Sequence, residues 1–178
     1  MPANYARGYV IGRLFKLSHK ECGMPQFHPF TGHKQLRIGR FSETGRVYLI
    51  TTSTFDRERI FSEWRYARAA IQAFLQPSLL KKSRVMTWVL MPDHVHWLLQ
   101  PGDDAGLSRL VGAMKSSSAR AVRQAGCKRR VWAPAFHDHA VRCEDDILPL
   151  ARYVVANPLR AGLVRRVGEY PFWDAIWM

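Results

Sequence analysis

Residues 85–99 read Val-Met-Thr-Trp-Val-Leu-Met-Pro-Asp-His-Val-His-Trp-Leu-Leu, and this stretch decides the fold class. Val85–Met91 is a run of β-branched, aromatic and other apolar residues, which predicts a strand. Pro92 and Asp93 are typical turn residues, and His94–Leu99 predicts the next strand. The stretch therefore predicts two strands joined by a tight turn.

A strand and a long helix are expected before this hairpin. Val47–Thr52 is rich in β-branched and aromatic residues and predicts a strand. Asp56 is a plausible N-cap for a helix that runs to about Leu75, and Pro77 stops it. Five apolar residues recur at helical spacing and are expected to form a buried stripe: Ile60, Trp64, Ala67, Ile71 and Phe74.

A helix, a strand and a short helix are expected after the hairpin. Leu107–Gln124 predicts a helix between two glycines, with Leu110, Met114 and Ala121 on its buried side. Ala135–Arg142 predicts a strand. Asp145 or Asp146 is then expected to cap a short helix that ends near Asn157, because the residue before Pro158 avoids the helical region.

This order of elements predicts a ferredoxin-like (RRM-like) α+β domain, with an antiparallel sheet and helices on one face. A chain of 178 residues suits one compact domain. Residues 1–44 are rich in Gly, Pro, His and basic side chains and are expected to form an arm. Residues 45–165 are assigned to the domain, and residues 166–178 to a tail that packs on it.

The charge of the chain points to a polyanionic partner. Lys and Arg total 27 against 14 Asp and Glu, a formal net charge of +13, which attracts nucleic acid. Hydrophobic residues make up 47%, so a disordered basic protein is excluded. No apolar run is long enough to span a bilayer. The three scattered cysteines favour a reducing cytoplasm over a disulfide framework.

His94 and His96 are the first candidate functional residues. Side chains two apart on a strand point to the same face, so both imidazoles can approach one cation. Imidazole suits divalent transition ions, and a metal ion can polarise a phosphoryl oxygen. The alternative is that both are ordinary surface or core histidines.

Tyr153 and Asn157 form the second candidate pair. They are four residues apart, so on a helix they lie on one face. A phenol becomes a nucleophile when a nearby cation or base favours the phenolate, and the Asn157 carboxamide oxygen is a candidate metal ligand. The alternative is that Tyr153 packs and Asn157 caps the helix before Pro158.

A basic surface is the third candidate feature. Arg109, Ser116, Arg120 and Arg123 share one side of the expected helix Leu107–Gln124. Guanidinium groups bind phosphates in a bidentate manner, and a solvated charged face is the alternative. The expected DNA contacts are Arg37, Arg40, Arg109, Lys115, Ser116, Arg120, Arg123, Lys128, Arg129 and Arg130.

Two segments resemble the motifs of one known family. Met91–Leu99 resembles the His-hydrophobe-His strand of HUH single-strand transposases. Arg152–Val164 resembles their nucleophile helix, in the branch called REP-associated tyrosine transposases. Further similarity lies in Gly45–Thr52, Met114–Ser116, Val131–Trp132, Phe136–His139 and near Tyr170–Pro171, so the resemblance covers most of the chain from about residue 35.

The resemblance implies a function. In that family the two strand histidines, matched here by His94 and His96, bind a divalent ion, magnesium or manganese. The helix tyrosine, matched by Tyr153, attacks a DNA phosphodiester and leaves a 5′-phosphotyrosine and a free 3′-hydroxyl. Asn157 stands where many relatives have a glutamine ligand. The implied partner is single-stranded DNA folded into imperfect-palindrome hairpins, bound by a monomer.

Three other functions compete with this one. A nucleotide hydrolase built on alternating histidines needs a third histidine two residues after His96, and that position is Leu98. A zinc protein could use His94, His96, His137 and His139 if their two strands adjoin. A catalytically idle hairpin-binding protein would keep the basic surface without needing Tyr153.

Overall fold

The computed structural model describes residues 45–81, 83–102, 106–141 and 146–177. The expected arm over residues 1–44, with Arg37 and Arg40, lies outside them. The described strands form one five-stranded sheet in the order β4-β1-β3-β2-β5, and every neighbouring pair is antiparallel. The strands are β1 (Tyr48–Ser53), β2 (Arg84–Met91), β3 (His94–Gln100), β4 (His137–Ala140) and β5 (Trp173–Ala175).

The predicted α+β, ferredoxin-like class is confirmed. The first four strands have the order β4-β1-β3-β2, and the quoted stretch forms the central β2–β3 hairpin, in which Met91 pairs with His94. The tail residues Trp173–Ala175 extend the sheet beside β2.

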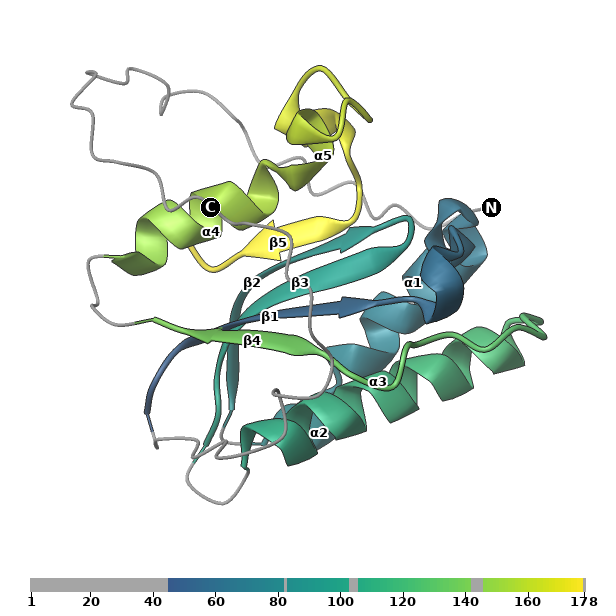
Figure 1. Ribbon diagram of the computed structural model, residues 1–178, viewed down its shortest axis with the longest axis horizontal. Coiled ribbons are helices and arrows are strands. Elements are labelled where there is room, and N and C mark those ends of the chain that lie inside the picture. Colours follow the sequence, from purple (N-terminus) through teal and green to yellow (C-terminus); the bar gives the residue numbers. More distant parts are fainter. Residues whose placement is uncertain (1–44, 82, 103–105, 142–145, 178) are drawn as a thin grey trace, which may run out of the picture.

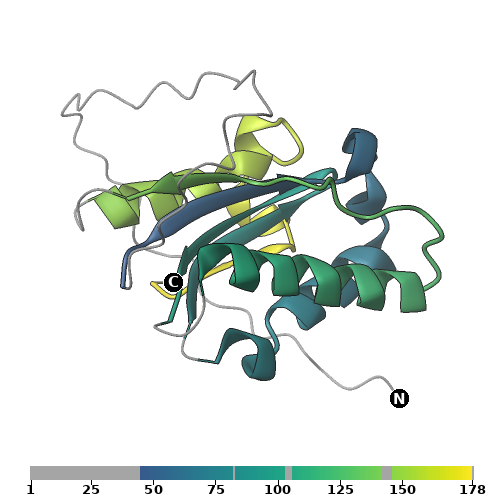
Figure 2. The same ribbon diagram turned by 60° about the horizontal axis from the view of Figure 1, so that its bottom comes forward.

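The helices lie on both sides of this sheet (Figure 1). Helices α1 (Trp64–Phe74) and α3 (Leu107–Gln124) pack against each other and cover one face, as the sequence predicted. Helix α4 (Ile147–Val155) lies on the opposite face, against β2 and β3 (Figure 2), so the prediction that the helices share one face holds only for α1 and α3. The remaining helical turns are η2 (Phe55–Arg57), η3 (Ile60–Ser62), α2 (Pro77–Leu80), α5 (Asn157–Arg160) and η5 (Val167–Glu169).

The alternation of β3 divides its side chains between these two faces. Val95 and Trp97 are fully buried, and Phe74 of α1 meets the Trp97 ring edge-on at 5.3 Å. Because successive side chains point to opposite faces, His94, His96 and Leu98 lie on the α4 face. The β3 histidines and α4 therefore share one side of the sheet.

The predicted start of the first helix was wrong. Asp56 does not cap α1; it has a φ of 50° and lies in η2, and α1 begins only at Trp64. The backbone N–H groups of Thr54 and Phe55 donate to the carbonyls of Asp93 and Val131. This anchorage to two other segments holds the chain at the sheet and delays the helix.

Three residues of the predicted buried faces are more exposed than expected, and one of them is Ile71 of α1, which is half-buried. Trp64 is 58% exposed, because the late start of α1 places it at the helix end. On α3, Leu110 and Met114 are buried as predicted, but Ala121 is half-buried and the neighbouring Val122 takes the core position. Ala67 and Phe74 of the predicted α1 stripe are buried.

Helix α4 ends close to the predicted position. It stops at Val155, and Asn157 opens the short α5 with Pro158 in its first turn. Proline has no N–H to donate to the carbonyl four residues before it, which here belongs to Val154. The Asn157 side chain donates to that carbonyl instead, at 3.1 Å. The chain thus turns without leaving this carbonyl unsatisfied.

Candidate active site

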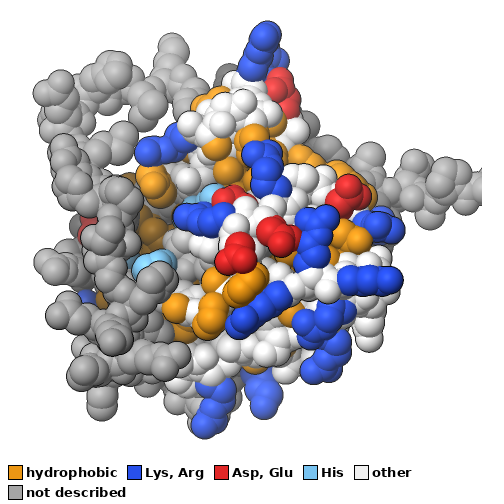
Figure 3. All heavy atoms as spheres, turned by 45° about the vertical axis from the view of Figure 1, so that its right-hand side comes forward, with side chains coloured by type: hydrophobic (Ala, Val, Ile, Leu, Met, Phe, Trp, Pro, Cys, Tyr) orange, Lys and Arg blue, Asp and Glu red, His pale blue; other side chains and the backbone are white. Residues whose placement is uncertain are grey.

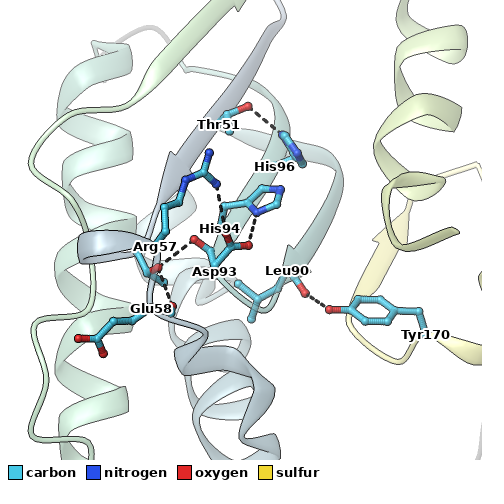
Figure 4. Close-up of polar contacts among 9 residues, drawn as sticks. Thr51, Arg57, Glu58, Leu90, Asp93, His94, His96 and Tyr170 are labelled. Carbon is cyan, nitrogen blue, oxygen red and sulfur yellow. Dashed lines mark hydrogen bonds and ion pairs between the residues drawn. The ribbon is translucent and has the colours of Figure 1, made fainter. Parts of the chain in front are cut away.

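The two β3 histidines form the centre of the candidate site. The rings of His94 and His96 lie edge to face, with centroids 4.8 Å apart. Each ring makes one hydrogen bond through Nδ1. His94 Nδ1 lies 2.7 Å from Asp93 Oδ1, and His96 Nδ1 lies 2.8 Å from Thr51 Oγ1 (Figure 4). Within the described residues, neither Nε2 atom has a hydrogen-bond partner, so both are available as ligands.

An acid and an arginine hold His94 in place. The hydrogen bond to His94, helped by the charges of His94 and Arg57, lowers the pKa of Asp93 although burial opposes this. The ionised carboxylate accepts from His94 Nδ1 and, 3.3 Å away, from the Arg57 guanidinium. A proton on Nδ1 leaves the lone pair on Nε2, the form in which a histidine binds a metal ion.

His96 is neutral at physiological pH. Burial, with the nearby positive charges of His94 and Arg57, lowers the pKa of His96 to about 3. A metal ion does not compete with a proton for such a ring near pH 7. His96 therefore presents a neutral imidazole beside His94.

The segment that carries Arg57 is backbone-strained. Asp56 and Arg57 have φ angles of 50° and 57°, in the left-handed region, which costs roughly 1–2 kcal/mol for each such residue. The Thr54 hydroxyl lies 2.7 Å from the Glu58 carbonyl and 2.9 Å from that of Asp93. These contacts fix the strained turn and aim Arg57 at Asp93. Sequence reasoning missed Arg57 and Thr51, whose roles come from contacts between distant segments.

Tyr153 and Asn157 are brought together at the end of α4. The Asn157 amide nitrogen donates to the carbonyls of Tyr153 and Val154 at 3.0 and 3.1 Å. Since only the nitrogen can donate, its Oδ1 atom is directed away from these carbonyls. The Tyr153 ring is partly exposed, and the Arg160 guanidinium lies 4.6 Å from its centroid. The Asn157 nitrogen supports the helix end, as the alternative expects, and the ligand role of its oxygen stays a prediction.

The expected DNA contacts fall into separate groups. Arg109, Ser116, Arg120 and Arg123 are exposed on α3, which lies across the sheet from the histidine pair (Figure 2). Lys128, Arg129 and Arg130 are exposed after α3, and Arg129 bonds Glu58 at 3.2 Å while Arg130 lies over the Phe55 ring. The second group therefore touches the turn that bears Arg57.

The Lys115 side chain is hydrogen-bonded to backbone carbonyls of the protein itself. Its ammonium donates to the carbonyls of Ala133, Pro134 and Ala135, at 2.7, 3.2 and 3.2 Å. Burial, with a smaller effect of the Arg130 charge, lowers the pKa of Lys115 to about 8. These bonds fix the segment before β4, and the DNA contact expected of Lys115 stays a prediction.

The four-histidine zinc site is ruled out by the strand order. His94 and His96 lie on β3, and His137 and His139 lie on β4, but β1 runs between these strands. Thr51 of β1 pairs with His96 on one side and His137 on the other. Among the described residues, no three His, Cys, Asp or Glu side chains are grouped as a metal site.

Lys and Arg side chains gather on the face seen in Figure 3, with some acidic side chains among them, and histidine is visible toward its left margin.

In the part of the chain that the structure describes, none of the helices has the length and apolarity that crossing a bilayer requires.

Comparison with known proteins places this site in a family. The family model described as "Transposase IS200 like" matches residues 45–153, more than half of the chain. A REP-associated tyrosine transposase of Escherichia coli K12 is 32% identical over 90 residues, 49% of this chain and 52% of the relative. The chain thus spans about half the length of that relative.

Two further relatives cover more of the chain. A putative REP-associated tyrosine transposase of Haemophilus influenzae is 26% identical over 139 residues, 72% of this chain and 78% of the relative. A solved REP-associated tyrosine transposase bound to a REP hairpin has a TM-score of 0.60 and 25% identity, covering 77% of this chain and 81% of its own. The resemblance found in the sequence motifs is confirmed.

Proposed function

The chain belongs to the IS200-like transposase family, and from that premise we propose that it is a metal-dependent nuclease and strand transferase acting on single-stranded DNA hairpins through Tyr153. One observation carries the proposal. The β3 histidines and α4, which bears Tyr153 and is followed directly by Asn157 at the start of α5, share one face of the sheet. Two imidazoles and a partly exposed phenol are the groups that the reaction needs.

The donor set fits a divalent metal ion. His94 and His96 offer two free Nε2 atoms, and Asn157 offers an amide oxygen. Mixed nitrogen and oxygen ligands suit Mn²⁺, and the oxygens of a DNA phosphate suit Mg²⁺ as well. When bound, the ion supplies a Lewis acid that stabilises charge on the scissile phosphate.

Tyr153 acts as the nucleophile in this proposal. Its phenolic oxygen forms a bond to the phosphorus and loses its proton, while the bond from phosphorus to the 3′-oxygen breaks and the 3′-oxygen takes up a proton. The products are a 5′-phosphotyrosine and a free 3′-hydroxyl. Because the covalent link preserves the phosphodiester energy, a 3′-hydroxyl can reverse the step onto another DNA end. Arg160, stacked on the Tyr153 ring, places a cation beside the phosphate.

The hairpin partner follows from two sources. The chain carries a net charge of +13, which favours DNA, and a relative of the same fold was solved with a REP hairpin. We extend that partner to this chain as part of the proposal. The monomeric state and the cytoplasmic location stay predictions.

The test is covalent trapping. The full chain is incubated with Mn²⁺ and a panel of single-stranded hairpins, and a denaturing gel separates protein from protein bearing DNA. We expect an adduct with the wild type, none in EDTA, and none with Tyr153→Phe, which still binds the hairpin. Tyr66→Phe, a change at a buried tyrosine on α1, is the control and keeps the adduct. An adduct that survives Tyr153→Phe contradicts the proposal.

A further inference from the structure

Trp64 stands out among the exposed side chains near the site. It opens α1 and remains 58% exposed, although its indole contacts Phe172 with centroids 4.9 Å apart. A single exposed apolar side chain is ordinary. The rings that support Trp64 and the charges near it, however, suit its exposed face for binding a ligand.

The indole rests on an anchored stack of rings, which we call the aromatic ladder: Trp64, Phe172 and Tyr170. Phe172 meets Tyr170 edge-on at 5.8 Å. Both of these rings belong to residues bound to Leu90 of β2: its N–H donates to the Phe172 carbonyl at 2.9 Å, and the Tyr170 hydroxyl donates to its carbonyl at 2.7 Å (Figure 4). One face of the Trp64 indole therefore packs on rings that are anchored to β2.

The aromatic ladder stands close to the candidate active site. Leu90 directly precedes Met91, the cross-strand partner of His94. The N–H of Phe61, three residues before Trp64, donates to the Pro92 carbonyl in the turn between β2 and β3 at 3.0 Å. Trp64 and His94 are thus tied to the same end of the central hairpin.

Three cationic side chains lie on α1 or next to the aromatic ladder. Arg59 lies close enough to Tyr170 for its charge to act on that phenol. Arg65 follows Trp64 and rests on the Tyr66 ring, and Arg68 lies one turn further along the same side of α1. All three arginines are exposed, and Glu63 is the acidic neighbour in sequence. Stacking surface and phosphate-binding charges together are typical of sites for single-stranded nucleic acid.

We propose that the exposed face of Trp64 stacks an unpaired base of the DNA strand that leaves the active site, while Arg59, Arg65 and Arg68 neutralise its phosphates. This inference rests on the proposed function, because that function places a DNA strand in the active site from which it reaches Trp64. The single-stranded DNA next to the hairpin stem is expected at Trp64, and the paired stem is expected at another surface. A base inside a duplex has no free face on which an indole can stack.

The experiment measures binding without cleavage, in EDTA. Fluorescein-labelled single-stranded oligothymidylate and a blunt-ended DNA hairpin are titrated with the full chain and with Trp64→Ala. We expect the variant to bind the oligothymidylate about 5- to 150-fold more weakly, the range for losing one stacked base. Blunt-hairpin binding should stay unchanged. The salt dependence for oligothymidylate should also stay unchanged, because no phosphate contact is removed.

Two matched variants sharpen the result. Trp64→Phe keeps a ring and should keep most of the affinity for oligothymidylate. Trp177→Ala removes another exposed tryptophan, 41% exposed beyond β5, and should bind like the wild type.

Two outcomes overturn the inference. One is unchanged oligothymidylate binding by Trp64→Ala, and the other is an equal loss on the blunt hairpin. The nuclease proposal fails separately: a wild type that needs Trp64 to bind oligothymidylate but forms no covalent adduct keeps the stacking site and loses the enzymatic assignment.

Discussion

At the scale of single residues, the account depends on how the two imidazoles are held. Asp93 bonds His94 Nδ1 at 2.7 Å, and Thr51 bonds His96 Nδ1 at 2.8 Å. Each contact orients a ring, and the ionised Asp93 carboxylate, which can only accept, places a proton on His94 Nδ1. Partners of this kind are worth roughly 10- to 100-fold in metal affinity in known sites.

Replacing Asp93 by Asn should therefore weaken Mn²⁺ binding by about 10- to 100-fold, because the carboxylate that orients His94 is lost. Electron paramagnetic resonance of free Mn²⁺ during a titration measures the affinity. Asp56→Asn is the control: Asp56 is exposed, and asparagine tolerates its positive φ. Equal Mn²⁺ affinity in wild type and Asp93→Asn would remove Asp93 from the site.

The buried imidazole of His96 predicts a pH dependence of folding. Its pKa is lowered to about 3 in the folded state from the ordinary value of 6.5. Between these values the unfolded chain binds the extra proton, so the free energy of unfolding falls as pH drops below 6.5. Urea unfolding in EDTA at pH 7 and pH 4 should show a steeper loss for the wild type than for His96→Gln. Parallel pH profiles would show that His96 takes up its proton equally in both states.

At the scale of elements, the C-terminal strand is joined to the sheet by a buried phenol. Tyr170 donates to the Leu90 carbonyl at 2.7 Å, and β5 adds ladder bonds to β2. Burial raises the pKa of Tyr170 to about 12. The hydroxyl thus remains protonated well into the alkaline range.

Tyr170→Phe should lower the free energy of unfolding by about 1 kcal/mol at pH 7, the ordinary net worth of one hydrogen bond. Above pH 10 the unfolded wild type loses the phenol proton while the folded state retains it, so the advantage of the wild type shrinks. Urea unfolding at pH 7 and pH 11 tests both parts. A variant as stable as the wild type at pH 7 contradicts the role of the hydrogen bond.

At the scale of the whole molecule, basic side chains lie on two different sides. The α3 group lies across the sheet from the histidines, whereas Arg129 and Arg130 contact the Glu58 and Phe55 side chains of the turn that bears Arg57. A DNA strand at the histidines is close to the second group. The two groups can be separated by charge removal.

Changing Arg129 and Arg130 together to Gln should reduce adduct formation at limiting DNA. It should also flatten the salt dependence of binding, since each lost phosphate contact removes a released counterion. The matched pair Arg120→Gln and Arg123→Gln reports on α3. If only the α3 pair changes the salt slope, the DNA surface is the one that the sequence pattern suggested.

The sequence predicted most of the fold because the decisive patterns are local. The period-two alternation of His94 and His96 and the helical spacing of Tyr153 and Asn157 are visible within a few residues. The start of α1 and the exposure of Trp64 were missed, because Thr54 and Phe55 are held by Asp93 and Val131 from other segments. Arg57 was missed for the same reason: its strained turn brings it to Asp93 across 36 positions.

The central claim is that Tyr153 becomes covalently joined to DNA at the histidine pair, and peptide mapping tests it most directly. Wild-type protein is incubated with Mn²⁺ and hairpin DNA, digested with nuclease and protease, and analysed by mass spectrometry. The account predicts a nucleotide attached to the peptide that contains Tyr153, in the wild type but not in His94→Ala or His96→Ala. A nucleotide found on another tyrosine, or on Tyr153 when both histidines are absent, would contradict it.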